Sequence, residues 1–128
     1  MVPARQENAM HILHSNMNLF PMVIRNRGLQ YCGNDRVSID YADDLSVMAS
    51  VRGTDVYQVS ISWQNGFLCV ACTCPQGENH YCKHIYAVLL TMENNNLLPS
   101  FQKIPNIRLK LVPQNALFQD DTLLKVPS

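Results

Sequence analysis

Four potential metal ligands lie close together in the sequence as two short pairs. Cys72 and Cys74 form the first pair, and Cys82 and His84 form the second, with seven residues between the pairs. Thiolate sulfur and neutral imidazole nitrogen are donors that tetrahedral zinc prefers. Because protein side chains fill all four positions, no coordination site is left for water or substrate. The spacing therefore predicts one structural zinc ion and not a catalytic one.

Each pair suits one type of backbone. Residues two positions apart on a strand point to the same side, so Cys72 and Cys74 can face one ion from a strand end. Cys82 and His84 are expected at a helix start, where unpaired backbone amides stabilise a thiolate. Two further residues are alternative ligands. Cys69 is left out, because strand alternation puts it on the opposite face from Cys72 and Cys74. His80 lies in the loop and is the reserve ligand if the register differs.

The residues before the first cysteine pair show the pattern of an antiparallel sheet. Apolar and polar residues alternate in four stretches, at residues 37–41, 45–51, 57–63 and 67–73. Asn65-Gly66, between the last two stretches, is the strongest hairpin signal in the chain. We therefore predict a four-stranded meander whose last strand carries the first cysteine pair.

Helical spacing returns after the loop at residues 75–81. Ile85, Val88, Leu89 and Met92 fall on one face, which predicts a helix that packs against the sheet and ends near Asn94–Asn96.

Two helices are predicted before the sheet. Met10, Leu13 and Met17 have helical spacing within residues 5–18. Pro21 is well placed to start a second short helix, which we expect to stop near Gly28 or Tyr31.

Together these elements predict an α+β fold: N-terminal helices, a four-stranded antiparallel meander, and a C-terminal helix joined to the last strand by the zinc site. The expected zinc-binding domain covers residues 1–98, with a zinc finger core at residues 55–92. Four prolines interrupt weak apolar pairs from Pro99 onward, so residues 99–128 are predicted to be an arm or linker.

Composition narrows the class of function. The 128 residues are 47% hydrophobic and 16% charged, as in a globular protein. Formal net charge is zero, which weakens any case for strong sequence-independent DNA binding. Residues 76–110 nevertheless carry a small positive excess, with four cations against two carboxylates.

The chain shows no sign of a membrane or secreted protein. No apolar stretch is long enough to span a bilayer, and the N-terminus lacks the apolar core of a secretory signal. Four of the five cysteines lie between residues 69 and 82, which suits metal binding in a reducing compartment. We therefore expect an intracellular protein, cytoplasmic in a bacterium or nuclear in a eukaryote, without a small-molecule substrate.

The zinc motif and its flanks resemble the SWIM zinc finger, a family defined by Cys-x-Cys, a variable loop and Cys-x-His. Here the motif reads CTCPQGENHYCKH, and CKHIYAVLL is similar to the family's usual helix. Upstream segments are also similar to the family's strands and to its Arg-Gly-x-x-Tyr element, namely Val51-Arg52-Gly53, Tyr57-Gln58-Val59, Arg27-Gly28, Tyr31 and Val37. The resemblance covers about residues 20–92 and rests mainly on the zinc motif.

The upstream element is typical of SWIM regions at the front of bacterial helicases of the chromatin-remodelling type. Two departures concern packing and not ligands: the family's aromatic pair is Tyr31-Cys32 here, and its turn glycine is replaced around Asp35. The resemblance implies structural zinc with DNA binding or protein contact. No helicase motif or phosphate-binding GxxxxGK[ST] loop occurs in the sequence, so any motor would lie on another polypeptide segment or partner.

Three functions follow as hypotheses. The first is a zinc-dependent module that binds DNA or a protein partner and belongs to, or assists, a DNA-processing ATPase or helicase. The second is a protein–protein adaptor without nucleic-acid binding, as in SWIM proteins that assist recombination complexes. The third is a thiol redox sensor or enzyme that uses Cys69 or Cys72. Nothing in the pattern predicts acid–base or serine catalysis.

Several other residues have a functional and a structural interpretation. Arg25, Arg27, Arg36 and Lys83 could contact phosphate, or they could be solvated charges. Tyr57 and Trp63 share the inward face of one strand, which favours core packing over base stacking.

The remaining cysteines and histidines are interpreted structurally. Cys32 and Cys69 are expected to be small core residues. His11 and His14 have no neighbouring cysteine, so they are expected to be surface or half-buried side chains and not ligands.

Overall fold

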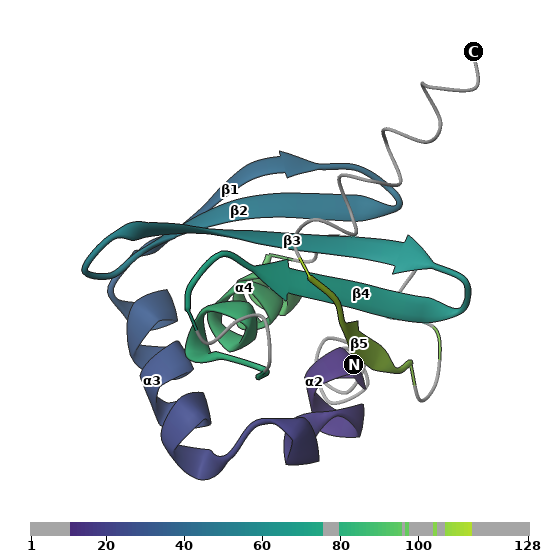
Figure 1. Cartoon of the computed structure of the whole chain (residues 1–128), viewed down its shortest axis with the longest axis horizontal. Coiled ribbons are helices and arrows are strands. Elements are labelled where there is room, and N and C mark those ends of the chain that lie inside the picture. The colour runs from purple at the N-terminus through teal and green to yellow at the C-terminus, as the bar shows by residue number, and fades with distance from the viewer. Residues whose placement is uncertain (1–10, 76–79, 96, 98–103, 105–106, 114–128) are drawn as a thin grey trace, which may run out of the picture.

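The helices that the structure describes lie on one side of a five-stranded sheet (Figure 1). The computed structural model describes residues 11–75, 80–95, 97, 104 and 107–113. The strands are neighbours in sequence order: β1 (Val37–Ala42), β2 (Ser46–Arg52), β3 (Val56–Gln64), β4 (Phe67–Cys72) and β5 (Leu109–Leu111). The first four pair antiparallel, which confirms the predicted meander, and β5 runs parallel to β4.

The β3–β4 hairpin forms where the sequence predicts it. Asn65 and Gly66 have φ angles of 53° and 85°, as a two-residue turn of this kind requires at both central positions. Trp63 consequently pairs with Leu68 and sets the register that carries Cys72 to the end of β4.

The fifth strand corrects the predicted four-stranded sheet. Leu109–Leu111 fall in the stretch that was expected to be an arm or linker, yet they pair with residues 68–70 of β4. The backbone amides of Leu68 and Val112 donate hydrogen bonds across this pair, at 2.9 and 3.0 Å. A three-residue strand is too short for alternation to reveal it in the sequence.

Helix α4 (Lys83–Asn94) covers the inner face of the sheet, as predicted (Figure 1). The inner face is formed by alternate residues of β2, β3 and β4, and the helix contributes a broad apolar side. These buried residues are Val47, Ala49, Val51, Val59, Ile61, Leu68, Val70, Ile85, Val88, Leu89 and Met92. Burial of this continuous apolar surface is the main contribution to the stability of the fold.

Helix α3 (Met22–Gly33) is longer than the sequence predicts and packs against α4. It begins directly after Pro21 as expected, but it continues past Gly28 to Gly33. Gly28 is buried, and a Cβ atom there would lie 2.6 Å from Cδ2 of Tyr86 and 3.1 Å from the carbonyl oxygen of Lys83. Gly28 therefore permits close helix packing and does not end the helix.

The first predicted helix ends earlier than expected in the structure. α2 (His11–Ser15) is followed by a 3₁₀ turn, η1 (Met17–Leu19), and residues 5–10 of the predicted helix lie outside the described part. The interruption falls at Asn16, whose amide Nδ2 donates to the carbonyls of Ile12 and Ile107. No helix among the described residues is both long and apolar enough to cross a membrane.

Candidate metal centre

The four predicted ligands come together at the junction of β4 and α4. The donor atoms of Cys72, Cys74, Cys82 and His84 all lie within 4.8 Å of one another, and all four residues are buried. His84 Nδ1 lies 3.7 Å from Sγ of Cys72 and 3.8 Å from Sγ of Cys82. Around a tetrahedral zinc ion, sulfur and nitrogen donors lie about 3.5 Å apart. The cluster thus has the donor types, number and spacing for this ion.

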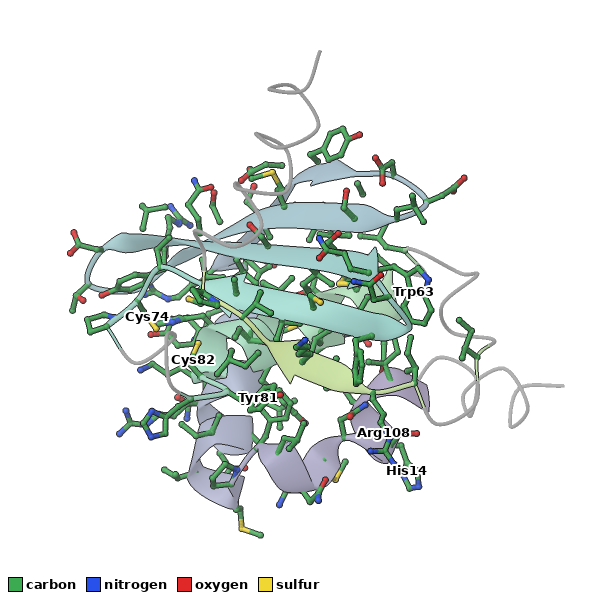
Figure 2. The ribbon with its side chains drawn as sticks, turned by 45° about the vertical axis from the view of Figure 1, so that its right-hand side comes forward. His14, Trp63, Cys74, Tyr81, Cys82 and Arg108 are labelled. Carbon is green, nitrogen blue, oxygen red and sulfur yellow. The ribbon has the colours of Figure 1, made fainter. Side chains whose placement is uncertain are left out.

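Local backbone structure explains why the two cysteine pairs converge. After β4 ends at Cys72, Thr73 still pairs with Gln58: its amide donates to the Gln58 carbonyl at 3.0 Å, and its hydroxyl accepts from the Gln58 amide at 2.9 Å. This contact holds Thr73 beside β3 while Cys74 follows it. Cys82 is the N-cap of α4, so His84 lies in the first helical turn. Figure 2 shows Cys74 and Cys82 at the same end of the molecule.

Thiolate charge in the cluster is stabilised by backbone amides. The amide of Cys74 donates to Cys72 Sγ at 3.5 Å, and the amide of Ile85 donates to Cys82. Hydrogen bonding with Cys72, followed by that with His84 and the Ile85 amide, lowers the pKa of Cys82 to about 4 despite its burial. The same bond and burial raise the pKa of Cys72. Zinc binds thiolates, so its binding releases the protons that the thiols carry without the metal.

Two tyrosine rings hold the imidazole of His84. Tyr57 stacks on it with ring centroids 4.6 Å apart, and Tyr31 meets it edge-on at 5.3 Å. Among the described residues, the buried Nε2 has no hydrogen-bond partner, while Nδ1 faces the sulfurs. Coordination through Nδ1 leaves the proton on Nε2, so packing by the rings, and not a hydrogen bond, orients this ligand.

Comparison with known protein families identifies this arrangement. Residues 57–93 match the family model described as the SWIM zinc finger. This segment is a SWIM zinc finger. It runs from β3 through β4 to α4, and the four clustered side chains position it to hold one zinc ion. The match confirms the resemblance of the zinc motif and its flanks to the SWIM zinc finger over residues 57–93.

A curated relative extends the similarity beyond the SWIM segment. The chain is 35% identical over 80 residues to an uncharacterized protein of Methanocaldococcus jannaschii. The match covers 62% of this chain and 33% of the relative, so the chain spans about a third of that protein's length. No solved structure matches the chain.

The other cysteines and histidines whose side chains the structure describes lie outside the zinc cluster formed by Cys72, Cys74, Cys82 and His84. Cys69 is buried and pairs with Ser62 across the sheet, and exposed His80 is not among the clustered residues.

Half-buried Cys32 accepts hydrogen bonds from Thr91 and from Asn94, in keeping with a structural role. His14 is exposed, and the side chain of His11 lies outside the description.

A cleft beside the zinc cluster is lined by three of the four cationic residues that the sequence analysis named as possible phosphate contacts. Arg27, Arg36 and Lys83 line it, whereas Arg25 does not. The other lining residues are Gln30, Tyr31, Asn34, Gly53 and Thr54. Sequence reasoning missed the polar ones, although Arg27, Gln30 and Asn34 have the spacing of a single polar helix face, which was the available signal.

Proposed function

We propose that the chain is a zinc-stabilised module that binds nucleic acid, with DNA as the first candidate, and that it is not itself an enzyme. The observation that carries this proposal is the basic cleft beside the zinc cluster, lined by Arg27, Arg36 and Lys83. Among the residues that the structure describes, no carboxylate lines this cleft. A cleft lined by several cations and by no carboxylate attracts a phosphate backbone.

A cleft can be positive although the net charge of the chain is zero, because carboxylates that balance the total charge can lie in other parts of the fold. Asp43 accepts backbone hydrogen bonds from Leu45 and Ser46 in the β1–β2 turn, and the Tyr41 hydroxyl, followed by these amides, lowers its pKa to about 2. Glu93 is buried at the end of α4. Neither Asp43 nor Glu93 is among the residues that line the cleft.

Zinc supports the cleft through two of its lining residues. Lys83 lies between two of the clustered side chains at the start of α4, and Tyr31 packs edge-on against His84. The arrangement of both residues depends on the β4–α4 junction that the ion closes. We therefore expect nucleic-acid binding to require the zinc-loaded form.

The test is a salt-dependent titration of the zinc-loaded chain with fluorescently labelled DNA. Three phosphate contacts predict that log affinity falls with log salt with a slope of about −2 to −3. Arg36→Ala should weaken binding and reduce the slope. Arg108→Ala is the matched control, because Arg108 is exposed at the opposite end of the molecule from the zinc cluster (Figure 2). Absence of binding at low salt would contradict the proposal.

A protein–protein adaptor is the second candidate, and a different surface favours it. Met22, Val23 and Leu29 of α3 are all more than half exposed although they are apolar. Exposed apolar side chains on one helix are a common feature of protein interfaces. A chain that fails to bind DNA yet is captured by a partner through these three residues would favour this function.

The proposal extends to the partner and the location of the protein. The resemblance of the upstream Arg-Gly-x-x-Tyr element supports association with a DNA-processing ATPase, helicase or recombination-type complex. The need to keep three thiols reduced supports an intracellular location. The redox alternative has less support, because Cys69 and Cys72 are both buried and thiol exchange requires access.

A further inference from the structure

The basic cleft has the size and the mixed chemistry of a nucleotide site. Its volume is about 490 Å³, within the range of small-ligand pockets. One wall is formed by Arg27 and Gln30 of α3 and by Asn34, the residue that caps the end of this helix, and Lys83 approaches from the start of α4. The β2–β3 turn at Gly53 and Thr54 also lines it. Three chain segments thus enclose a hollow with several kinds of polar group.

Gly53 keeps one side of this hollow free of a side chain. A Cβ atom at this position would lie 3.0 Å from the Tyr31 hydroxyl and 3.4 Å from the ring of Tyr57. The backbone therefore approaches Tyr31 closely, while the Tyr31 ring rests against His84. This wall is fixed by packing to the zinc cluster, so a ligand would meet a preformed surface.

The cleft offers two different sets of hydrogen-bonding groups. Arg27, Arg36 and Lys83 are suited to phosphate oxygens. The Gln30 and Asn34 side chains each provide donors and an acceptor, which suit the edge of a base and not a phosphate alone. Both amide side chains are exposed. Charge alone would explain three of these residues, and a nucleotide explains all five.

We infer that the cleft receives one unpaired nucleotide of a single-stranded nucleic acid, with its phosphate on the three cations and its base on Gln30 and Asn34. This inference rests on the proposed function and narrows it. A duplex presents its phosphates on a convex surface and keeps its bases stacked, so its base edges would not enter a concave site between helices. A single strand can turn one nucleotide out of its stack.

The test compares a labelled single strand of about eight nucleotides with a duplex of the same sequence, both titrated with the zinc-loaded chain. The single strand should bind at least about tenfold more tightly. Excess mononucleotide should compete with it.

Substitutions separate the two sets of groups. Arg36→Ala should lower single-strand affinity about tenfold and make the salt slope shallower by about 0.7. The double substitution Gln30→Ala and Asn34→Ala should lower the affinity several-fold and leave the salt slope unchanged, because it removes no charge. Asn18→Ala is the matched control, since it removes an exposed amide that does not line the cleft. Zinc content should be unchanged in every variant, since none of these residues is in the cluster.

The outcomes distinguish this inference from the function on which it rests. Equal or tighter binding of the duplex, or no effect of the double amide substitution, would overturn the nucleotide site and leave DNA binding standing. No binding of either nucleic acid at low salt would overturn both.

Discussion

The two ends of α4 each hold a buried polar side chain, and they hold it by different interactions. His84, at the start, is 3% exposed and faces sulfurs from residues within twelve positions in the sequence. Glu93, in the last turn, is 4% exposed, and its Oε2 accepts a hydrogen bond from the amide of Leu13, 80 positions away. The first end depends on an ion and a local motif, and the second depends on the packing of distant segments.

Further contacts tie the second end to the edge of the sheet. Asn16 donates to the carbonyls of Ile12 and Ile107 at 2.8 and 2.7 Å, and it accepts from the amide of Leu109 at 3.2 Å. α2 and the Asn16 side chain that follows it therefore link the end of α4 to β5, through hydrogen bonds between side chains and backbone groups. Zinc thus secures the core at the start of α4, and a network of hydrogen bonds secures it at the end of the same helix.

Removal of a ligand at the zinc end should have the largest effect. His84→Ala and Cys82→Ser are each expected to lower zinc content and to reduce unfolding free energy by more than about 4 kcal/mol, because a structural ion contributes directly to folding. Elemental analysis and thermal melting measure the two effects together. Cys32→Ser is the control, since Cys32 lies outside the cluster and should retain the ion. Unchanged melting in both ligand variants would contradict the assignment.

Asn16→Ala tests the opposite end and should have an intermediate effect. The substitution leaves the buried carbonyl of Ile107 and the buried amide of Leu109 without the Asn16 side chain as hydrogen-bond partner. This loss should cost about 2–4 kcal/mol of stability. Chemical denaturation measures the loss, with exposed Asn18→Ala as the control. Zinc content should stay unchanged, because the two ends are held independently. A loss of zinc in Asn16→Ala would show that they are coupled instead.

Glu93→Gln should have the smallest effect and the clearest pH dependence. Burial raises the pKa of Glu93 from 4.5 to about 7, against hydrogen bonds from the Leu13 and Ile12 amides that lower it. The folded protein therefore keeps a proton that the unfolded chain releases above about pH 4.5. The stability associated with this proton is fully present below that pH and is lost as pH rises through 7.

Glutamine cannot ionise, so the variant should become more stable than the parent as pH rises. The difference should reach the order of 2 kcal/mol near pH 8. Denaturation of the zinc-loaded proteins at several pH values from about 6 to 8 measures it. Parallel stability curves for the two proteins would show that Glu93 is not held in a buried site.

The same contrast explains what the sequence can predict. Cys-x-Cys, Cys-x-His and the alternation of β2, β3 and β4 are local patterns, so the meander, α4 and the clustering of four side chains follow from them. β5 is only 3 residues long, too short for alternation to reveal. The roles of Asn16 and Glu93 are not visible either, because their long-range partners lie 80 to 93 positions away. The helix α3 was expected to end near Gly28 or Tyr31 and continues to Gly33, because Gly28 serves close packing against Tyr86 and does not end the helix.

The site shows a similar limit. Arg27, Arg36 and Lys83 were candidates for phosphate contact, but only the fold shows that they share a cleft from which Arg25 is absent. The support of His84 by Tyr31 and Tyr57 also depends on tertiary packing of three separate elements. Donor types could thus be predicted, whereas their surroundings could not.

X-ray absorption at the zinc edge of the purified, reduced chain tests the central claim most directly. One ion per chain, with three sulfur neighbours at about 2.3 Å and one nitrogen at about 2.0 Å, is the predicted result. A preparation without zinc, or a first shell of nitrogen and oxygen alone, would contradict the account.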